Sequence, residues 1–401
     1  YTLSLGPAVI RRLLLHVYEL EGVWSDYYFF DENCSFNLLY LLDVARPGTD
    51  LADDAGAWVI PLDTIRAVQA KGMVASVEYR ASKSTKIRHL AAQLSDEEQD
   101  RAIAVARGDL PLDALDAPDD GTRRKVLSTD LATEYLQYLY FGRSITQQDY
   151  APRLRALATR RARLGNTEAL HLPGIEAPAR PDLGHRSSRV ALGGGTVDGR
   201  GFGELSYRAV YHDLIDNRGG YLEGSQIVFG ALDLRFDDED LWIEHLNLVD
   251  IVSLTPRDRF FAQTSWKAQT GWLRRMSADG VRELVYDFRY GLGRSYQGSI
   301  PGLWYLLAEG DVQLGGTLDG NHALGVGGTT GLLRGFGRRV QSHVFARAIR
   351  FFTGEEGNTI QAGGAVNLET STNTALRVEI TRNGEEDRWW WDASLRLHAF
   401  F

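Results

Sequence analysis

The pattern of hydrophobic and polar positions changes once along the chain, and the two patterns predict two kinds of structure. Over roughly residues 1–170 the apolar positions recur every three to four residues, as Val9, Leu13, Val17 and Leu20 do. That spacing places them on one face of an α-helix. The first part of the chain is therefore predicted to be mostly amphipathic helices.

Capping signals mark where several of these helices begin and end. Asn33 precedes the apolar run CSFNLLYLLDVA and is suited to cap its first turn. Another helix is expected between Pro61 and Gly72, because proline favours helix starts and glycine favours helix ends. Ser95 and Glu98 have the spacing of a capping box, which predicts a third start.

After a proline-rich stretch, LPGIEAPARPDLGH, the period changes to two. In ELVYDFRYGLG, for example, alternate residues are apolar and the others are charged, and WDASLRLHAFF at the end repeats the pattern. About 12 segments of about ten residues read this way, which suits strands that cross a bilayer at a tilt. A soluble β-sandwich or a lipocalin-like barrel is the alternative, although soluble surfaces rarely carry continuous aromatic and aliphatic faces.

Charged residues would line the inside of such a barrel. Two interpretations are open: a selective pore, or opposite charges that pair across a narrow lumen, and we favour the paired charges. The residues expected to face the lumen are Asp287, Arg289, Glu309, Asp311, Arg377, Glu379, Arg396 and His398.

Composition narrows the function further. With 401 residues the chain is too long for one ordinary domain. A net charge of −9 gives a nucleic-acid partner no electrostatic support. A single cysteine excludes an internal disulfide framework and a cysteine-rich metal site, and we expect no cofactor. The sequence shows no basic-then-apolar leader at Tyr1, so we expect any targeting segment to have been removed or to lie outside it.

The only cysteine, Cys34, falls in the first turn of the helix that Asn33 is expected to open. Unpaired backbone N–H groups and the helix dipole favour a thiolate there, and the same N–H groups can hold an oxyanion. The alternative is a small buried hydrophobe, since free cysteine is among the most buried residue types. A nucleophile also needs a base. His16 precedes it in an apolar stretch and by pattern is expected to pack.

The stretches DYYFFDENCSFNLLYLLDVARPG, WVIPLDTIRAV and EYRASKSTK resemble the Lnb N-terminal periplasmic domain family, over roughly residues 1–90. The most specific part runs from Tyr28 to Leu39 around the Asn-Cys-Ser motif. The resemblance implies a circularly permuted papain-like fold, related to NlpC/P60 and lecithin:retinol acyltransferase-like enzymes. Characterised relatives include a lipoprotein N-acyltransferase. In such folds a histidine strand precedes the cysteine helix, so we expect the base upstream of Tyr1, with His16 or another chain as alternatives.

The resemblance implies that Cys34 attacks a phospholipid ester and passes the acyl chain to a lipoprotein amine. The backbone N–H groups of Cys34 and Ser35 would hold the oxyanion, and Asn33 would cap the helix. A cell-wall peptidase of NlpC/P60 type is a second hypothesis, and a non-catalytic anchor or assembly partner is a third. An apolar groove beside the thiol would favour lipid, whereas a polar cleft would favour peptide. The last strand, ending in Phe401, resembles the C-terminal signature of outer-membrane barrels, which implies insertion by the barrel assembly machinery.

We therefore expect an α+β multidomain protein of the bacterial outer membrane. Residues 1–90 would form a partial papain-like periplasmic segment with Cys34, and 91–171 a helical extension. A linker at 172–186 would lead to a barrel of about 12 antiparallel transmembrane strands at 187–401.

Overall fold

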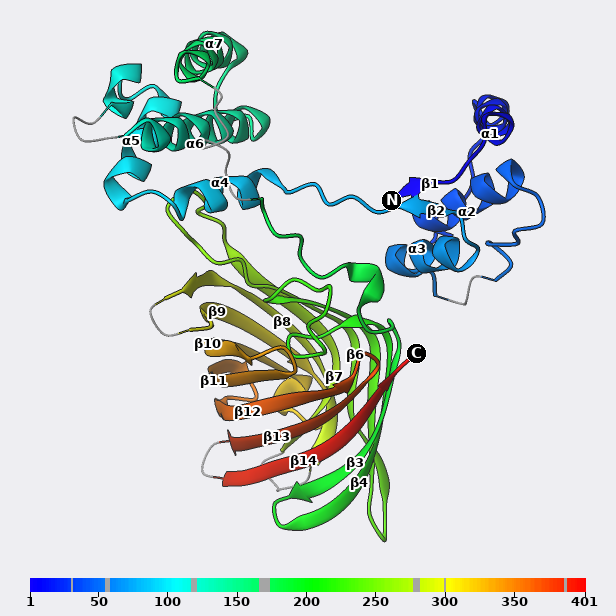
Figure 1. Ribbon diagram of the computed structural model, residues 1–401. Helices are drawn as coiled ribbons and strands as arrows, with labels where there is room; N and C mark the ends of the chain where they lie inside the picture. Colours follow the sequence, from blue (N-terminus) through cyan, green and yellow to red (C-terminus); the bar gives the residue numbers. More distant parts are fainter. Residues whose placement is uncertain are drawn as a thin grey trace. The chain divides into compact units, whose positions relative to one another are not determined.

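The computed structural model describes residues 1–29, 32–54, 58–116, 121–165, 174–276, 282–298, 301–385 and 388–401 (Figure 1). The chain divides into two compact units. One combines Tyr1–Ser76 with Ala179–Phe401, and the other is Val77–Pro178. The predicted boundary between residues 171 and 172 lies outside the described residues.

The N-terminal segment holds three helices, α1 (Pro7–Glu19), α2 (Cys34–Ala45) and α3 (Pro61–Ala70). Strands β1 (Thr2–Leu3) and β2 (Val74–Ser76) pair antiparallel. The predicted helix starts at Asn33 and Pro61 are confirmed. A small apolar core joins α2 to α3 and to the loops beside them, and its buried members are Leu39, Leu42, Leu51, Ala52, Val68 and Met73.

Helix α1 is confirmed, but its apolar face is only partly covered. Val9 and Leu13 are half-buried, whereas Val17 and Leu20 from the same predicted face are exposed. The helix has no fully buried residue. The apolar pattern therefore predicted the helix but not what its face packs against.

The second unit is a helical cluster built around α6 (Thr122–Phe141), which packs against α4 (Lys83–Ala91), α5 (Asp96–Arg107) and α7 (Gln147–Arg163). The capping box of Ser95 and Glu98 is confirmed at the start of α5. A short 3₁₀ helix, η1 (Leu112–Leu115), is followed by Asp116, which accepts hydrogen bonds of 2.7 and 2.8 Å from Arg160 on α7. These hydrogen bonds lower the pKa of Asp116 to about 2.

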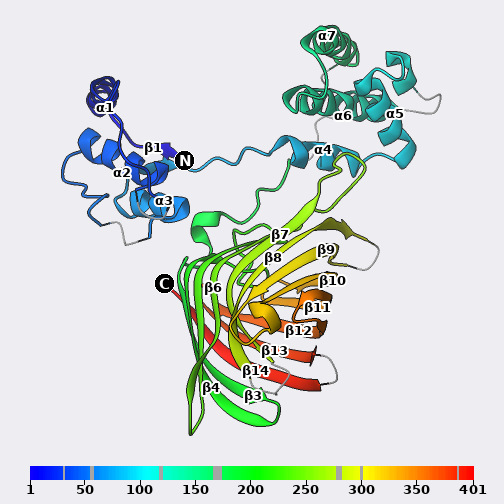
Figure 2. The ribbon, with the colours of Figure 1, turned by 180° about the vertical axis from the view of Figure 1, so that it is seen from behind.

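The C-terminal part of the chain begins with a 3₁₀ turn, η3 (Pro181–Leu183), and then forms a closed antiparallel barrel of twelve strands in its described residues (Figure 2). Strand β14 closes the ring by pairing with β3, with Phe400 opposite Arg189. The strands are β3 (Arg189–Val197), β4 (Arg200–His212), β5 (Ser225–Phe236), β6 (Leu241–Ser253), β7 (Ser265–Met276), β8 (Arg282–Gln297), β9 (Leu303–Leu314), β10 (His322–Phe336), β11 (Val340–Gly354), β12 (Gly357–Ser371), β13 (Thr374–Glu385) and β14 (Arg388–Phe400).

The predicted alternation of the strands is confirmed. On β9, Leu306 is 65% exposed, whereas its neighbour Leu307 is 1% exposed. Glu309 and Asp311 are buried on the same inner side as Leu307. Because the apolar residues face outward all round the ring, the wall suits a lipid environment rather than water. Among the described helices, none is long and apolar enough to cross a membrane.

Ion pairs fill much of the lumen, as expected for paired interior charges. Arg347 on β11 reaches Glu309 at 2.8 Å and Asp311 at 2.6 Å. Arg235 on β5 lies 2.8 Å from Glu204 of β4, and further pairs bridge strands elsewhere in the ring. Breaking one partner of a buried pair leaves an uncompensated charge, so these contacts hold the wall together. A cavity of about 550 Å³ remains inside.

The loops differ in length between the two ends of the barrel. We call the end where β3 begins the linker end, and the opposite end the far end. The described far-end turns are short and span 198–199, 237–240, 315–321 and 355–356. The linker end carries longer loops at 213–224 and 254–264. Bacterial outer-membrane barrels have the opposite arrangement, with short turns at the periplasmic end.

Candidate functional site

Cys34 is the first residue of α2, and its thiol is exposed. Asn33 caps the helix: its Oδ1 accepts hydrogen bonds from the backbone N–H groups of Ser35 at 3.0 Å and Phe36 at 3.2 Å. The Ser35 hydroxyl donates to the same oxygen at 2.6 Å. The structure therefore brings Asn33 and Ser35 together beside the thiol, with the positive end of the helix dipole at Cys34.

Asn33 also fixes the chain on either side of the thiol. Only 5% of the residue is exposed, and its Nδ2 donates to the carbonyl oxygens of Val59 at 2.6 Å and Phe29 at 3.3 Å. One side chain thus ties the segment before α2 to the segment that leads into α3. The neighbouring motif residues Phe30 and Asp31 lie outside the described residues.

The two backbone donors predicted for an oxyanion differ in the structure. The Ser35 N–H is engaged by Asn33, so it serves an oxyanion only if that bond is released. For the Cys34 N–H, no hydrogen bond is recorded with any residue that the structure describes. Of the two donors, only the Ser35 N–H therefore has a partner among the described residues.

His16 lies on α1, where its Nδ1 is 3.2 Å from the Glu19 carboxylate one turn later. No bond between His16 and Cys34 is recorded among the described residues, so the structure does not show a thiol–imidazole pair. The carboxylate would orient the imidazole, which is what a base needs from a third group. The role of His16 stays a prediction.

Several apolar side chains that are near Cys34 in the sequence are exposed. Leu38, one turn after Cys34 on the same face of α2, is half exposed, and so are Tyr27 and Phe29. Trp24 is 88% exposed. Such a concentration of exposed aromatic and aliphatic groups is unusual for a surface that meets only water.

The same apolar segment touches the barrel wall. The ring of Phe29 meets the ring of Phe229 on β5 edge to face, with 5.6 Å between the ring centroids. Phe229 shares its side of β5 with the exposed Ile227, while Val228 between them is buried inward. The chain leading to Cys34 therefore lies against the outward, lipid-compatible side of the barrel.

A polar joint connects the N-terminal segment to the start of the barrel, and sequence reasoning missed it. The Arg66 guanidinium on α3 donates to the backbone carbonyls of Asp182, Gly184 and His185 at 2.8–3.2 Å. Asp182 also accepts bonds from Tyr1 and Gln69. Burial alone would raise the pKa of Asp182, but hydrogen bonds from Arg180, Tyr1 and Gln69 hold it well below its usual range. No signal in the sequence marks Arg66 for this role, because its partners are backbone atoms more than a hundred residues away.

One group of side chains has the residue types of a metal site. His185, His212 and Asp216 offer ligand atoms within 4.8 Å of one another, and all three are buried. The two imidazoles face each other, with His185 Nε2 3.0 Å from His212 Nδ1. The Asp216 carboxylate already pairs with guanidinium groups of β4 and β13 at 2.6 and 2.8 Å. Those cations disfavour a further positive charge, so the group is better explained as packing at the linker end.

Three family models match the chain, and their boundaries lie close to the boundaries of the two compact units. A model described as "Lnb N-terminal periplasmic domain" matches residues 1–71. A model described as "Domain of unknown function (DUF7842)" matches 77–173, and one described as "Domain of unknown function (DUF7840)" matches 178–400. No curated protein matches the chain.

Several solved structures are similar to this chain over about half of its length. The KdgM porin in complex with disordered oligogalacturonate is 8% identical, with 53% of this chain and 99% of that chain covered and a TM-score of 0.31. OmpTdeltaL8 of Vibrio cholerae is 7% identical, covering 53% and 97%, with a TM-score of 0.29. Omp33 of Acinetobacter baumannii is 10% identical, covering 54% and 99%, with a TM-score of 0.24. These scores are too low to carry an argument about function.

The location follows from the periplasmic domain and the barrel together. A closed strand ring with an apolar outer wall lies in the outer membrane, and the Lnb domain that precedes it lies in the periplasm. The linker end of the barrel is then the periplasmic end, because the chain enters β3 there and an even number of strands returns it to the same side. The chain belongs to the family described as "Domain of unknown function (DUF7840)", and it is an outer-membrane barrel protein with an Lnb N-terminal periplasmic domain.

Proposed function

We propose that the protein is a thiol-dependent acyltransferase at the periplasmic face of the outer membrane, with Cys34 as its nucleophile. The acyl donor is a membrane phospholipid, and the acceptor is the amine of a lipoprotein. The observation that carries the proposal is the exposed thiol at the first residue of α2, within a segment that matches the Lnb periplasmic domain.

The reaction has two halves. In the first, the Cys34 thiolate attacks the ester carbonyl of the phospholipid, a C–S bond forms, and the ester C–O bond breaks. The lysophospholipid leaves with the proton that the base took from the thiol. In the second half the acceptor amine attacks the thioester, an amide forms, and the C–S bond breaks. The amine's proton returns to the thiolate through the base.

The helix start supports both halves electrostatically. The positive end of the α2 dipole stabilises the negative charge that develops on the carbonyl oxygen during attack. The Cys34 N–H is the immediate oxyanion donor, and the Ser35 N–H adds a second if Asn33 turns away. Asn33 is then a positioning residue, since it holds the backbone that carries the thiol.

A base must still remove the thiol proton. Within this chain His16 is the candidate, since the Glu19 carboxylate next to it would orient the imidazole. It would have to approach Cys34 from α1, which packs beside α2.

The surroundings favour a lipid donor over a cell-wall peptide. The residues before and after Cys34 expose Trp24, Tyr27 and Leu38, and Phe29 rests on the outer wall of the barrel. A lipid chain gains free energy from such contacts, whereas a polar peptide gains little. Because the barrel holds this segment at the bilayer, the lipid need not leave the membrane. Insertion by the barrel assembly machinery remains part of the proposal.

The decisive experiment uses the full chain in vesicles of phosphatidylethanolamine, with intact-protein mass spectrometry. We expect a gain of one acyl chain, released by hydroxylamine as a thioester should be, and none in Cys34→Ala. Because the chain holds one cysteine, the adduct has a single possible thiol. Adding a lipopeptide with a free amine should convert the adduct to an amide.

Other outcomes separate the rival functions. Cleavage of peptidoglycan peptides by the unaltered protein, without an acyl adduct, would favour the NlpC/P60-like peptidase. Full activity of Cys34→Ala in a deletion strain would end both enzymatic hypotheses and favour the anchor. His16→Ala should slow adduct formation by about a hundredfold or more if His16 is the base. His89→Ala on α4 is the matched control and should change nothing.

A further inference from the structure

The loop that joins β4 to β5, residues Asp213–Gly224, is held by buried charges at the periplasmic end of the barrel. The Asp213 carboxylate lies 2.9 Å from Arg189 of β3 and 2.8 Å from Arg377 of β13. Asp216 lies 2.6 Å from Arg208 of β4 and 2.8 Å from Arg377. Removing the loop from this position would leave three guanidinium groups buried without these partners, which is strongly unfavourable.

A second set of contacts attaches the loop to the turn between β12 and β13. The Nδ2 of Asn217 donates to the carbonyl oxygens of Ser371 and Thr372, both at 2.9 Å. Its Oδ1 accepts a hydrogen bond of 3.2 Å from Asn367 of β12. Asn217 is buried. Moving the loop away would therefore break these bonds and leave buried polar groups unsatisfied, which is unfavourable.

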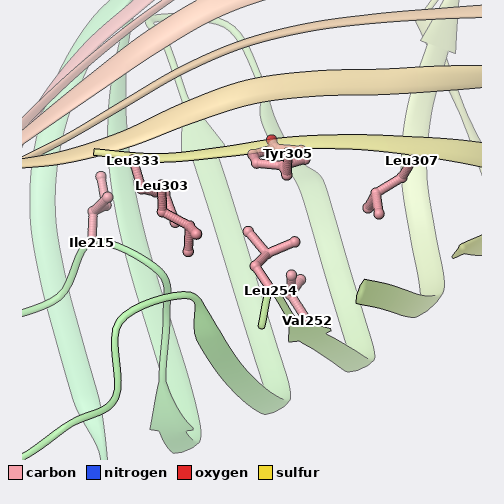
Figure 3. Close-up of a cluster of buried hydrophobic side chains, with 7 residues drawn as sticks. All are labelled: Ile215, Val252, Leu254, Leu303, Tyr305, Leu307 and Leu333. Carbon is pink, nitrogen blue, oxygen red and sulfur yellow. The ribbon is translucent and has the colours of Figure 1, made fainter. Parts of the chain in front are cut away.

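Between its two aspartates the loop turns an apolar side chain toward the lumen. Ile215 is buried in an apolar cluster, and Figure 3 shows it reaching from the loop toward Leu303 and Leu333. The other members are Val252, Leu254, Tyr305 and Leu307. Leu333 belongs to β10, which stands six strands from β4 in either direction around the ring of twelve. The loop therefore starts at one wall and packs against the opposite wall.

Little space remains beside the loop. Between it and the wall of β10 and β11 the cavity measures about 10 Å³, room for about one water molecule. The large lumen cavity of about 550 Å³ has Asp213, Leu214 and Ile215 among its lining residues. The loop thus borders the lumen cavity.

We infer that the Asp213–Gly224 loop is a built-in plug that closes the barrel at its periplasmic end, so that the barrel is an anchor with a blind cavity and not an open pore. The inference is independent of the chemistry at Cys34. A plug explains why this periplasmic loop is unusually long. The loop must reach from β4 toward the opposite wall, and its two carboxylates hold it in place.

Electrical recording from planar bilayers tests the closure directly. The unaltered full chain should show no stepwise ion currents. A variant in which residues 213–223 are replaced by a short glycine-serine turn should show clear steps. A variant in which the β5–β6 turn, 237–240, is replaced by the same glycine-serine turn is the control for an altered barrel connection and should stay silent. Heat-shifted mobility on gels verifies that each barrel is folded before it is recorded.

A disulfide test works even if the shortened barrel does not fold. In the Cys34→Ala background, Ile215→Cys with Leu333→Cys should cross-link under mild oxidation, whereas Ile215→Cys with Val344→Cys, on the outer wall of β11, should not. Ion currents through the unaltered protein that match those of the shortened variant would overturn the inference. So would failure of the first cysteine pair to cross-link in a folded barrel.

Discussion

At the scale of single residues, two polar side chains with several partners each decide where the chain runs. Asn33 accepts hydrogen bonds from two N–H groups in the first turn of α2 and donates to two carbonyls, one before α2 and one in the segment that leads into α3. Asn33 stabilises this segment through its several partners, because each buried hydrogen bond that is lost leaves an unsatisfied polar group. Asn217 does the same for the plug loop, with three backbone or amide partners on β12 and in the turn between β12 and β13.

Replacing Asn33 by alanine should loosen the first turn of α2. A lost N-cap costs about 1 kcal/mol, which corresponds to about fivefold faster local opening. Hydrogen exchange of the peptide that holds the Ser35 and Phe36 amides measures this directly. Ser35→Ala is the control, since it removes only the hydroxyl bond and keeps Asn33 as the cap. Unchanged protection in Asn33→Ala would show that the cap does not stabilise the site.

At the scale of elements, the sequence predicted more about the strands than about the helices, because it also predicted which side of each strand is buried. The two-residue period of β8 or β14 predicted both the strand and the side that faces lipid, because pleating alone fixes which residues share a side. The period of α1 predicted a helix, but Val17 and Leu20 are exposed, since the pattern does not encode which partner covers the face. Capping at Asn33 and Ser95 was predictable because its partners lie within three residues.

The outer wall of the barrel gives a depth-dependent prediction. Leu395 is exposed near the middle of β14, so arginine there should lower the free energy of unfolding by about 2–4 kcal/mol. Leu241 is exposed at the far end of β6, where arginine should cost about 0–1 kcal/mol. Denaturant titration of folded protein in vesicles measures both. Equal costs at the two positions would contradict a membrane-embedded wall.

The helical unit gives a prediction about pH. The folded-state pKa of Asp116 is lowered to about 2 from 3.8 by Arg160, so its contribution to stability is present above pH 3.8 and lost as the pH falls toward 2. Asp116→Asn should therefore lower the melting temperature of the helical signal at pH 6. The difference from the unaltered protein should shrink between pH 4 and pH 2, as followed by circular dichroism. A difference that persists at pH 2 would assign the effect to something other than this charge.

At the scale of the whole molecule, the order of segments followed from the sequence and the long-range contacts did not. The change of period and the proline-rich linker predicted helices before a barrel, and the Asn-Cys-Ser motif identified the thiol. The Arg66 joint and the plug loop were missed. Charges such as Asp213 and Arg377 carry no sequence mark of their partner, and 164 residues separate them. From its local sequence alone, HDLIDNRGG would be predicted to form only a turn.

The short turns at the far end have a consequence for the cell that carries this protein. Because the linker end lies in the periplasm, the far end faces the outside of the cell, and its described turns are only two to seven residues long. Phages and antibodies bind protruding loops, and external proteases cleave them. Along these turns they find very little, so intact cells should display the protein poorly even when they contain a great deal of it.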